Sequence, residues 1–219
     1  MERLEELYEN LKIYQDDNLY CFTSDAILLS KFASVKAGDI VADFCSGSGV
    51  VGLHTYALNP NIKSLTLIEM QKSLYDLSVK SIEINGLGDK VRAINCRVQD
   101  VPKEFNGQFS LILCNPPYMP IGCGQTDEKQ EIAVCKSELT ITLKELIINV
   151  KRCLKFGGRF CMVHRADRLV DALSLMRENG IEPKRLQMVS GGIKQPYLFL
   201  VEGVKGGKSG LKILNELTN

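Results

Sequence analysis

Short apolar runs alternate along this chain with segments whose apolar residues recur every three or four positions. The runs predict buried strands, and the recurring spacing predicts amphipathic helices. From residue 40 onward the pattern predicts strands at 40–46, 64–69, 91–98, 109–114, 157–164, 185–190 and 195–203. Between them it predicts helices at 50–58, 73–84, 137–154 and 165–180.

This alternation is typical of α/β proteins and predicts a mostly parallel, seven-stranded sheet with helices on both faces. The last two strands are separated by a turn at Gly191-Gly192, so we expect them to form an antiparallel hairpin. A chain of 219 residues is long enough for one structural domain. Within it we distinguish an N-terminal lid, residues 1–35, from the main domain, residues 36–219.

The lid is predicted to contain a hairpin over 11–22, with Asp17-Asn18 at its tip, and a helix over 24–33. It either covers one edge of the sheet or supplies contacts to a ligand near the sheet. Near the other end of the chain, the glycine-rich segment GVKGGKSG, residues 203–210, is predicted to be mobile.

Composition excludes several classes of protein. No apolar stretch approaches the roughly 18 residues that a membrane span needs, so we expect a cytoplasmic protein without membrane contact. The eight cysteines form no CxxC pair and have no histidine at ligand-like spacing, so we expect reduced thiols and no metal site. Nothing in the sequence specifies an oligomeric state.

Charge is distributed unevenly. The whole chain carries a net charge of only +1, but residues 151–219 contain 13 Lys or Arg against 6 Asp or Glu. This basic C-terminal third is either a surface that faces phosphates or a set of dispersed, solvated charges.

The stretch DFCSGSGVVG, residues 43–52, follows a predicted strand and begins a predicted helix, and Glu69 ends the next strand. Glycines at 47, 49 and 52 permit a tight turn and close approach of a ligand, and an acid after the second strand can accept hydrogen bonds from a ribose. NAD is one candidate ligand. Asp43 favours S-adenosylmethionine instead, because a carboxylate in the turn repels a pyrophosphate and attracts an ammonium group. A tight turn without a ligand is the remaining alternative.

Other residues are expected to lie near this cofactor because of their positions beside the motifs. Asp100 follows the third predicted strand, where its carboxylate can accept from the adenine amine or serve only as a helix cap. The remaining candidates are Cys45 in the turn, Met70 after Glu69, Val101 after Asp100, and Thr23 and Asp25 in the lid.

Residues 114–119 read CNPPYM and follow the fourth predicted strand. Two adjacent prolines stop a strand, because each fixes its own φ and the second restricts the first. They do not explain the flanking Asn115 and Tyr118. Ligands of open α/β sheets bind beyond the carboxyl ends of the strands, so this segment is expected to face the cofactor.

These motifs together resemble the class I S-adenosylmethionine-dependent amino-methyltransferases, which modify adenine N6, glutamine N5 or guanine N2. Their motif, [N/D/S]-P-P-[Y/F/W], is matched in full by residues 115–118. Residues 20–33, 131–147 and 198–213 also resemble the bacterial tRNA (adenine-N6)-methyltransferases that act beside the anticodon of valine tRNA.

The resemblance implies a Rossmann-like class I methyltransferase fold and S-adenosylmethionine as cofactor. It also implies a catalytic group of Asn115, Pro116, Pro117 and Tyr118, with the Asn115 side chain and the Pro116 carbonyl accepting the hydrogens of the substrate amine and Tyr118 stacking on it. The implied partner is tRNA, contacted by the basic C-terminal third and by the long loop at 119–136.

Other acceptors stay open, namely a glutamine N5 of release factors, adenine N6 in ribosomal RNA, and adenine N6 in DNA. Only about forty residues precede the first predicted strand of the main domain, which disfavours the substrate-binding domain usual in the glutamine enzymes. A non-enzymatic nucleotide-binding or RNA-binding module is disfavoured because Asn115 and Tyr118 are both present.

Overall fold

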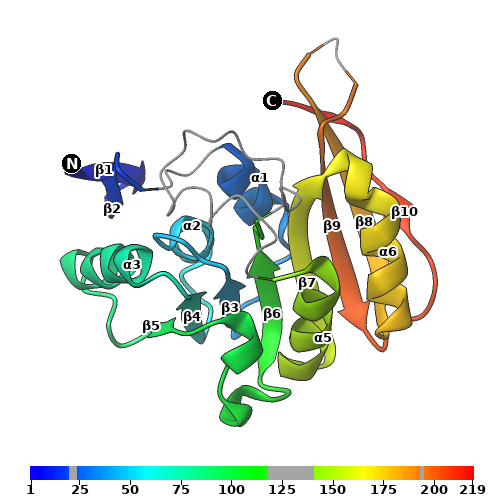
Figure 1. Cartoon of the computed structure of the whole chain (residues 1–219), viewed down its shortest axis with the longest axis horizontal. Helices are drawn as coiled ribbons and strands as arrows, with labels where there is room; N and C mark the ends of the chain where they lie inside the picture. Colours follow the sequence, from blue (N-terminus) through cyan, green and yellow to red (C-terminus); the bar gives the residue numbers. More distant parts are fainter. Residues whose placement is uncertain (20–23, 118–140, 193–194) are drawn as a thin grey trace.

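The computed structural model describes residues 1–19, 24–117, 141–192 and 195–219 (Figure 1). All seven predicted strands form, although several bounds differ. They are β3 Ile40–Phe44, β4 Ser64–Glu69, β5 Val91–Asn95, β6 Phe109–Cys114, β7 Leu154–Arg165, β8 Ile181–Ser190 and β9 Leu198–Lys205. The helices that follow or separate them are α2 Val50–Leu58, α3 Lys72–Ile84, α5 Leu143–Cys153 and α6 Leu169–Glu178, with short 3₁₀ turns at Val98–Asp100, Lys103–Phe105 and Ala166–Arg168.

The main sheet has the order β10-β8-β9-β7-β6-β3-β4-β5, and β11 also pairs with β8. Strands β3 to β7 pair in parallel, and β9 is antiparallel to β8, as the sequence predicts. Strand β9 is also antiparallel to β7. Two short strands, β10 Lys212–Ile213 and β11 Leu217–Thr218, were not predicted and bring the sheet to nine strands.

Both faces of the sheet are buried, which explains why the central strands read as continuous apolar runs. In β6, Phe109, Ile112 and Cys114 face the core that α5 and α6 cover. Leu111 and Leu113 face the opposite core, which α2, α3 and α1 (Ser24–Phe32) cover. The chain therefore forms the layered helix-sheet-helix arrangement that its alternating pattern predicts.

The N-terminal hairpin is real, but its predicted position is wrong. Its strands are β1 Glu2–Tyr8 and β2 Leu11–Asp16, so its tip is at residues 9–10, where Glu9 has a φ of 48°. Residues 17–18 form a separate turn, in which the Asn18 amide donates to Asp16 Oδ1 at 2.8 Å. Most of β1 is exposed, so it lacks the apolar alternation by which a strand is recognised. The proposed division after residue 35 stays a prediction.

The helix predicted at 137–154 begins only at Leu143 within the described residues. Thr142 caps it: its hydroxyl accepts from the Glu145 amide at 3.2 Å, and the Glu145 carboxylate accepts from the Thr142 amide at 2.9 Å. The helix ends at Cys153 and β7 begins at Leu154. Residues 137–140 and the predicted loop 119–136 lie outside the described residues.

The segment predicted as mobile begins inside β9, which continues to Lys205. The chain then returns along β8, where the Leu214 amide donates to the Leu186 carbonyl at 2.8 Å. No described helix is long and apolar enough to cross a membrane.

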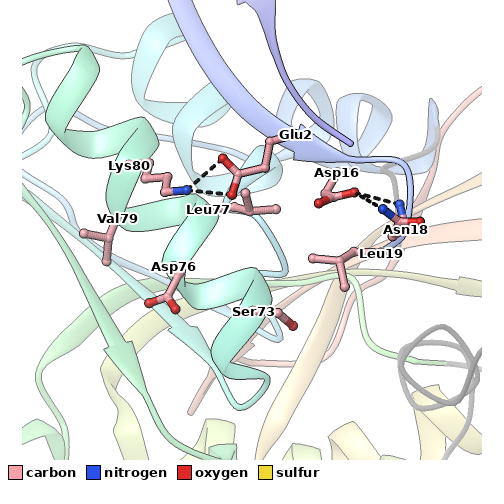
Figure 2. Close-up of a pocket in the computed structure, with 9 residues that line it drawn as sticks. All are labelled: Glu2, Asp16, Asn18, Leu19, Ser73, Asp76, Leu77, Val79 and Lys80. Atoms are coloured by element: carbon pink, nitrogen blue, oxygen red, sulfur yellow. Dashed lines mark hydrogen bonds and ion pairs between the residues drawn. The ribbon is translucent and has the colours of Figure 1, made fainter.

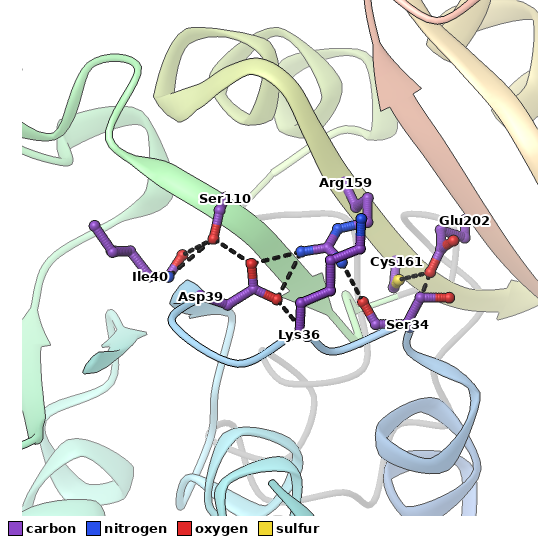
Figure 3. A network of polar contacts seen from close by, with 8 residues as sticks. All are labelled: Ser34, Lys36, Asp39, Ile40, Ser110, Arg159, Cys161 and Glu202. Atoms are coloured by element: carbon purple, nitrogen blue, oxygen red, sulfur yellow. Dashed lines mark hydrogen bonds and ion pairs between the residues drawn. The ribbon is translucent and has the colours of Figure 1, made fainter. Parts of the chain in front are cut away.

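A buried polar network lies where β3 begins (Figure 3). Both carboxylate oxygens of Asp39 lie 2.6 Å from Arg159 Nη2, and Ser110 Oγ donates to Asp39 Oδ1 at 2.7 Å. Arg159 Nη1 also donates to the Ser34 carbonyl at 2.6 Å, just after α1. The network therefore ties the end of α1 to three strands, at the end of the sheet opposite the carboxyl ends of β3 and β6.

Candidate active site

The carboxyl ends of β3, β4 and β6 lie together at one end of the sheet, the end toward which the β6 arrow points in Figure 1. Asp43 is in register with Leu113, and Phe44 with both Cys114 and Ile68. The register therefore brings together the glycine turn after β3, Glu69, and the segment that begins at Asn115. The strand order reverses between β3 and β6, which is where open α/β sheets bind ligands.

The glycine turn uses backbone conformations that side chains disfavour. Gly47 and Gly49 have φ of 56° and 93°, and Cys45 also has a positive φ, of 59°. A Cβ at Gly52 would lie 2.5 Å from Leu67 Cδ2, so this glycine permits α2 to pack against β4. A Cβ at Gly47 would meet nothing within 4 Å, which leaves the turn open to a ligand there.

Asp43 is completely buried beneath the turn. Its Oδ2 accepts from the Gly52 amide at 2.8 Å, and its Oδ1 has no hydrogen-bond partner among the described residues. Burial, with a further contribution from the nearby Glu69 charge, raises the pKa of Asp43 to about 8. The site therefore favours a proton or a cationic group beside Asp43.

Glu69 holds the turn from the neighbouring strand. Its Oε2 accepts from the Gly47 amide and its Oε1 from the Gln71 amide, both at 2.8 Å. Burial raises the pKa of Glu69, although these amides act in the opposite direction. The Met70 amide acts in the same direction as these two, and because a carboxylate has about four acceptor positions, Glu69 can still accept from a hydroxyl group. The exposed Met70 follows it, and its carbonyl accepts from Asn95 Nδ2 at 3.0 Å.

Asn115 lies directly after β6 and is half-buried. Its side-chain oxygen is buried and has no hydrogen-bond partner among the described residues. Pro116 is buried and Pro117 is half-buried, while Tyr118 lies outside the described residues. A buried amide oxygen without a donor is costly unless a ligand supplies one.

Cys45 and Cys114 lie side by side between the glycine turn and Asn115. Burial, together with a hydrogen bond between the two thiols, raises the pKa of Cys114 well above its ordinary value. Cys114 is therefore an unreactive part of the floor of the site.

The remaining predicted cofactor residues are placed differently. The side chain of Asp100 is 54% exposed and forms an ion pair with Arg97 at 2.7 Å, which lowers its pKa. Val101 packs into the core beneath α5. Asp25 is buried in the first turn of α1, and Thr23 lies outside the described residues. The cofactor roles predicted for these residues stay predictions.

Sequence reasoning missed a contact from the hairpin. Gln15 on β2 is buried, and its Nε2 donates to Ser48 Oγ in the glycine turn at 2.5 Å. Gln15 Oε1 and Ser46 Oγ are also buried without a hydrogen-bond partner among the described residues. The polar run QDDN at 15–18 gave no sign of this contact, because the hairpin reaches the turn only through tertiary packing.

A cavity of about 580 Å³ lies between the hairpin and α3 (Figure 2). Lys80 closes one side of it by donating to Glu2 Oε1 at 2.6 Å. The cavity is lined by Glu2, Asp16, Asn18, Leu19, Ser73, Asp76, Leu77, Val79 and Lys80, and none of them is a predicted site residue. No group of three or more His, Cys, Asp or Glu within the described segments could hold a metal ion.

A family model described as the methyltransferase small domain matches residues 21–179. This chain belongs to that family. The methyltransferase assignment that the motifs predict is therefore confirmed at the level of the family. The roles of the individual NPPY residues stay predictions.

Curated relatives agree with this family. A tRNA1(Val) (adenine(37)-N6)-methyltransferase of a Flavobacteriaceae bacterium is 26% identical over 71% of this chain and 64% of its own length. A protein of the same name from Shewanella putrefaciens is 23% identical over 78% of this chain and 72% of its own length. The chain thus spans slightly less than two thirds of the first of these relatives.

Solved structures confirm the Rossmann-like class I methyltransferase fold. A predicted O-methyltransferase from Agrobacterium tumefaciens has a TM-score of 0.68 at 16% identity, covering 89% of this chain and 86% of its own. A geranyl diphosphate C-methyltransferase from Streptomyces coelicolor, solved with S-adenosyl-L-homocysteine, has a TM-score of 0.61 at 15% identity, covering 83% of this chain and 77% of its own. At these identities the likeness concerns the fold alone.

Proposed function

We propose that this chain transfers a methyl group from S-adenosylmethionine to the exocyclic N6 amine of an adenine in RNA, specifically in a tRNA next to the anticodon. The observation that carries this proposal is the buried Asn115 oxygen, which has no donor among the described residues. Asn115 directly follows β6, which pairs with β3. The glycine turn after β3 covers a second buried acceptor, Asp43 Oδ1. One site thus offers acceptors for a cationic cofactor and for an amine.

The residues of the glycine turn fit S-adenosylmethionine. Asp43 would attract its ammonium group, and Glu69 would accept from its ribose hydroxyls. The open space at Gly47 and the exposed Met70 leave room for the rest of the molecule. When bound, the cofactor would supply an electrophilic methyl carbon. A pyrophosphate cofactor fits less well, because it brings neither a cation nor a hydrogen-bond donor to the buried Asp43 Oδ1.

Asn115 and Pro116 would activate the acceptor by orienting it. The lone pair of an aromatic amine is delocalised into its ring, so the nitrogen is a weak nucleophile. If the Asn115 side-chain oxygen and the Pro116 carbonyl accept its two hydrogens, the nitrogen can pyramidalise and direct its lone pair at the methyl carbon. As the new N–C bond forms, the bond from the methyl carbon to the sulfonium sulfur would break and release a neutral thioether, and the cationic nitrogen would then lose one proton to water, so no strong base is required.

The choice of adenine in tRNA rests on the curated relatives, whose names specify adenine N6 of tRNA1(Val). Such a substrate would place the activity in the cytoplasm. A glutamine amide could occupy the same clamp, because it is also planar and carries two hydrogens. The nature of the acceptor therefore has to be tested directly.

The test uses unmodified bulk tRNA and isotopically labelled S-adenosylmethionine, followed by nucleoside mass spectrometry. We expect labelled N6-methyladenosine from the unsubstituted chain. Asn115→Ala should lower kcat by about 100-fold or more, because it removes an acceptor used in the transition state, while the cofactor Kd changes less than about twofold. Asn61→Ala, an exposed asparagine at the opposite end of the sheet, is the matched control.

Two results would contradict the proposal. Full turnover by Asn115→Ala would exclude the proposed role of the amide. Label found in glutamine of a release factor, with none in adenosine, would replace RNA by protein as the acceptor.

A further inference from the structure

Ten of the twelve described basic residues of the C-terminal third fall into two groups. Five arginines each form an ion pair with a carboxylate: Arg159 with Asp39, Arg165 with Asp167, Arg168 with Asp171, Arg177 with Glu182 and Arg185 with Glu202. By contrast, none of five lysines forms an ion pair with any described carboxylate: Lys151, Lys155, Lys184, Lys205 and Lys208. Most of the positive charge that has no ion pair among the described residues therefore lies on these lysines, and Arg152 and Lys212 carry the rest.

Contacts between the segments show that these lysines share one edge of the molecule. Lys205 Nζ donates to the carbonyls of Lys151 and Leu154, both at 2.7 Å, where α5 ends and β7 begins. Lys184 Nζ donates to the Lys208 carbonyl at 3.0 Å. We call this surface, with Phe156, the lysine edge.

Phe156 gives the lysine edge an aromatic side chain. It is 80% exposed. Its ring nevertheless lies against Gly206: a Cβ at that position would be only 2.2 Å from Phe156 Cε2. The ring thus lies beside the turn that carries Lys205 and Lys208. An exposed aromatic ring among lysines suits a nucleic acid, whose sugars and bases pack on rings and whose phosphates attract ammonium groups.

We propose that the lysine edge is a second contact surface for the phosphate backbone of the RNA substrate, remote from the active site. This inference rests on the proposed function. The edge lies at the start of β7 and the end of β9, whose arrow in Figure 1 points away from the carboxyl end of β6. Leu154, two residues before Phe156, is in register with Phe109, and Met162 is in register with Cys114; the five residues from Phe109 to Cys114 correspond to roughly 17 Å along the sheet.

The position of the lysine edge defines what kind of RNA uses both surfaces. A substrate must extend roughly 17 Å from the methylated base before it reaches the lysines. At roughly 3 Å per base pair, a helical arm of six or more base pairs can do this, whereas a loop closed by only two or three base pairs cannot. Carboxylates limit the edge on one side, where Glu178 is exposed and Glu182 is paired with Arg177.

The test compares a full-length tRNA transcript with a short hairpin that carries the same loop. The variant is Lys151→Gln, Lys155→Gln and Lys208→Gln, three exposed side chains outside the active site. The matched control is Lys12→Gln, Lys63→Gln and Lys103→Gln, which removes the same charge from exposed positions elsewhere. Binding is measured by fluorescence anisotropy across a salt series, so it does not depend on turnover.

We expect the lysine-edge variant to bind full-length tRNA about tenfold more weakly, with a salt slope smaller by about one for each lysine engaged. Its affinity for the short hairpin, and the affinities of the control variant, should change less than about twofold. Unchanged binding of full-length tRNA, or an equal loss for both RNAs, would overturn the proposal. If the unsubstituted chain binds tRNA but does not methylate it, the proposed function fails while the lysine edge is still tested.

Discussion

Replacing Asp43 by asparagine tests how the buried carboxylate affects stability and binding in opposite directions. The pKa of Asp43 is raised from an ordinary 3.8 to about 8, chiefly by burial. A group whose pKa is higher in the folded state holds its proton more tightly there. Its contribution to stability is therefore complete below about pH 4 and is lost as the pH rises through about 8.

The magnitude follows from the size of this shift. At about 1.4 kcal/mol for each pKa unit, the contribution of Asp43 should fall by about 4 kcal/mol between pH 5 and pH 8. An asparagine side chain does not titrate, so the free energy of unfolding of Asp43→Asn should gain about this amount relative to the unsubstituted chain over the same range. Glu69 is present in both proteins, so its contribution to the pH dependence of the free energy of unfolding largely cancels in the comparison.

Urea unfolding followed by circular dichroism, at four pH values from 5 to 8, measures the difference between the two proteins. Calorimetry measures the accompanying loss of affinity for S-adenosylmethionine, which we expect to be about tenfold or more because asparagine cannot ionise to pair with the ammonium group of the cofactor. A stability difference that stays constant across the pH range would refute the assignment of the raised pKa to Asp43. Unchanged cofactor affinity would refute its role in binding.

Two further substitutions test the structure itself. Thr142→Ala should lower the free energy of unfolding by about 1 kcal/mol, because it removes the cap of α5. This loss should lower the thermal midpoint by about 2–4 °C. An unchanged midpoint would show that the cap contributes nothing. Asp39→Ala should cost about 3–5 kcal/mol, because it leaves the buried Arg159 guanidinium without its carboxylate, and urea unfolding would contradict this if the loss stayed below about 1 kcal/mol.

The central sheet could be predicted because its signal is local. In β6, apolar residues fill nearly every position because both faces of the sheet are covered. Elsewhere, after β3, Gly49 marks the start of α2. The same features located the glycine turn and Glu69, since each follows a strand that is recognisable by itself. The parts of the candidate site that lie at the ends of these strands could therefore be predicted from the sequence.

The parts that could not be predicted depend on contacts between distant segments. The exposed strand β1 has no apolar face, so only its pairing with β2 identifies it. Gln15 reaches Ser48 across 33 positions of the chain, and nothing near Gln15 indicates this contact. The start of α5 was placed too early because the apolar residues around Thr142 continue the helical spacing, and the capping box overrides that spacing.

The two-residue strands β10 and β11 have a practical consequence for work with this protein. They bind the free side of β8, and the Asn219 amide donates to the Ser190 carbonyl at 2.9 Å. A shortened protein that ended after β9 would leave the amides and carbonyls of β8 open to strands of other molecules, which is how exposed sheet edges nucleate aggregates. The glycine-rich tail resembles a disposable linker in sequence, but trimming it would be expected to reduce solubility.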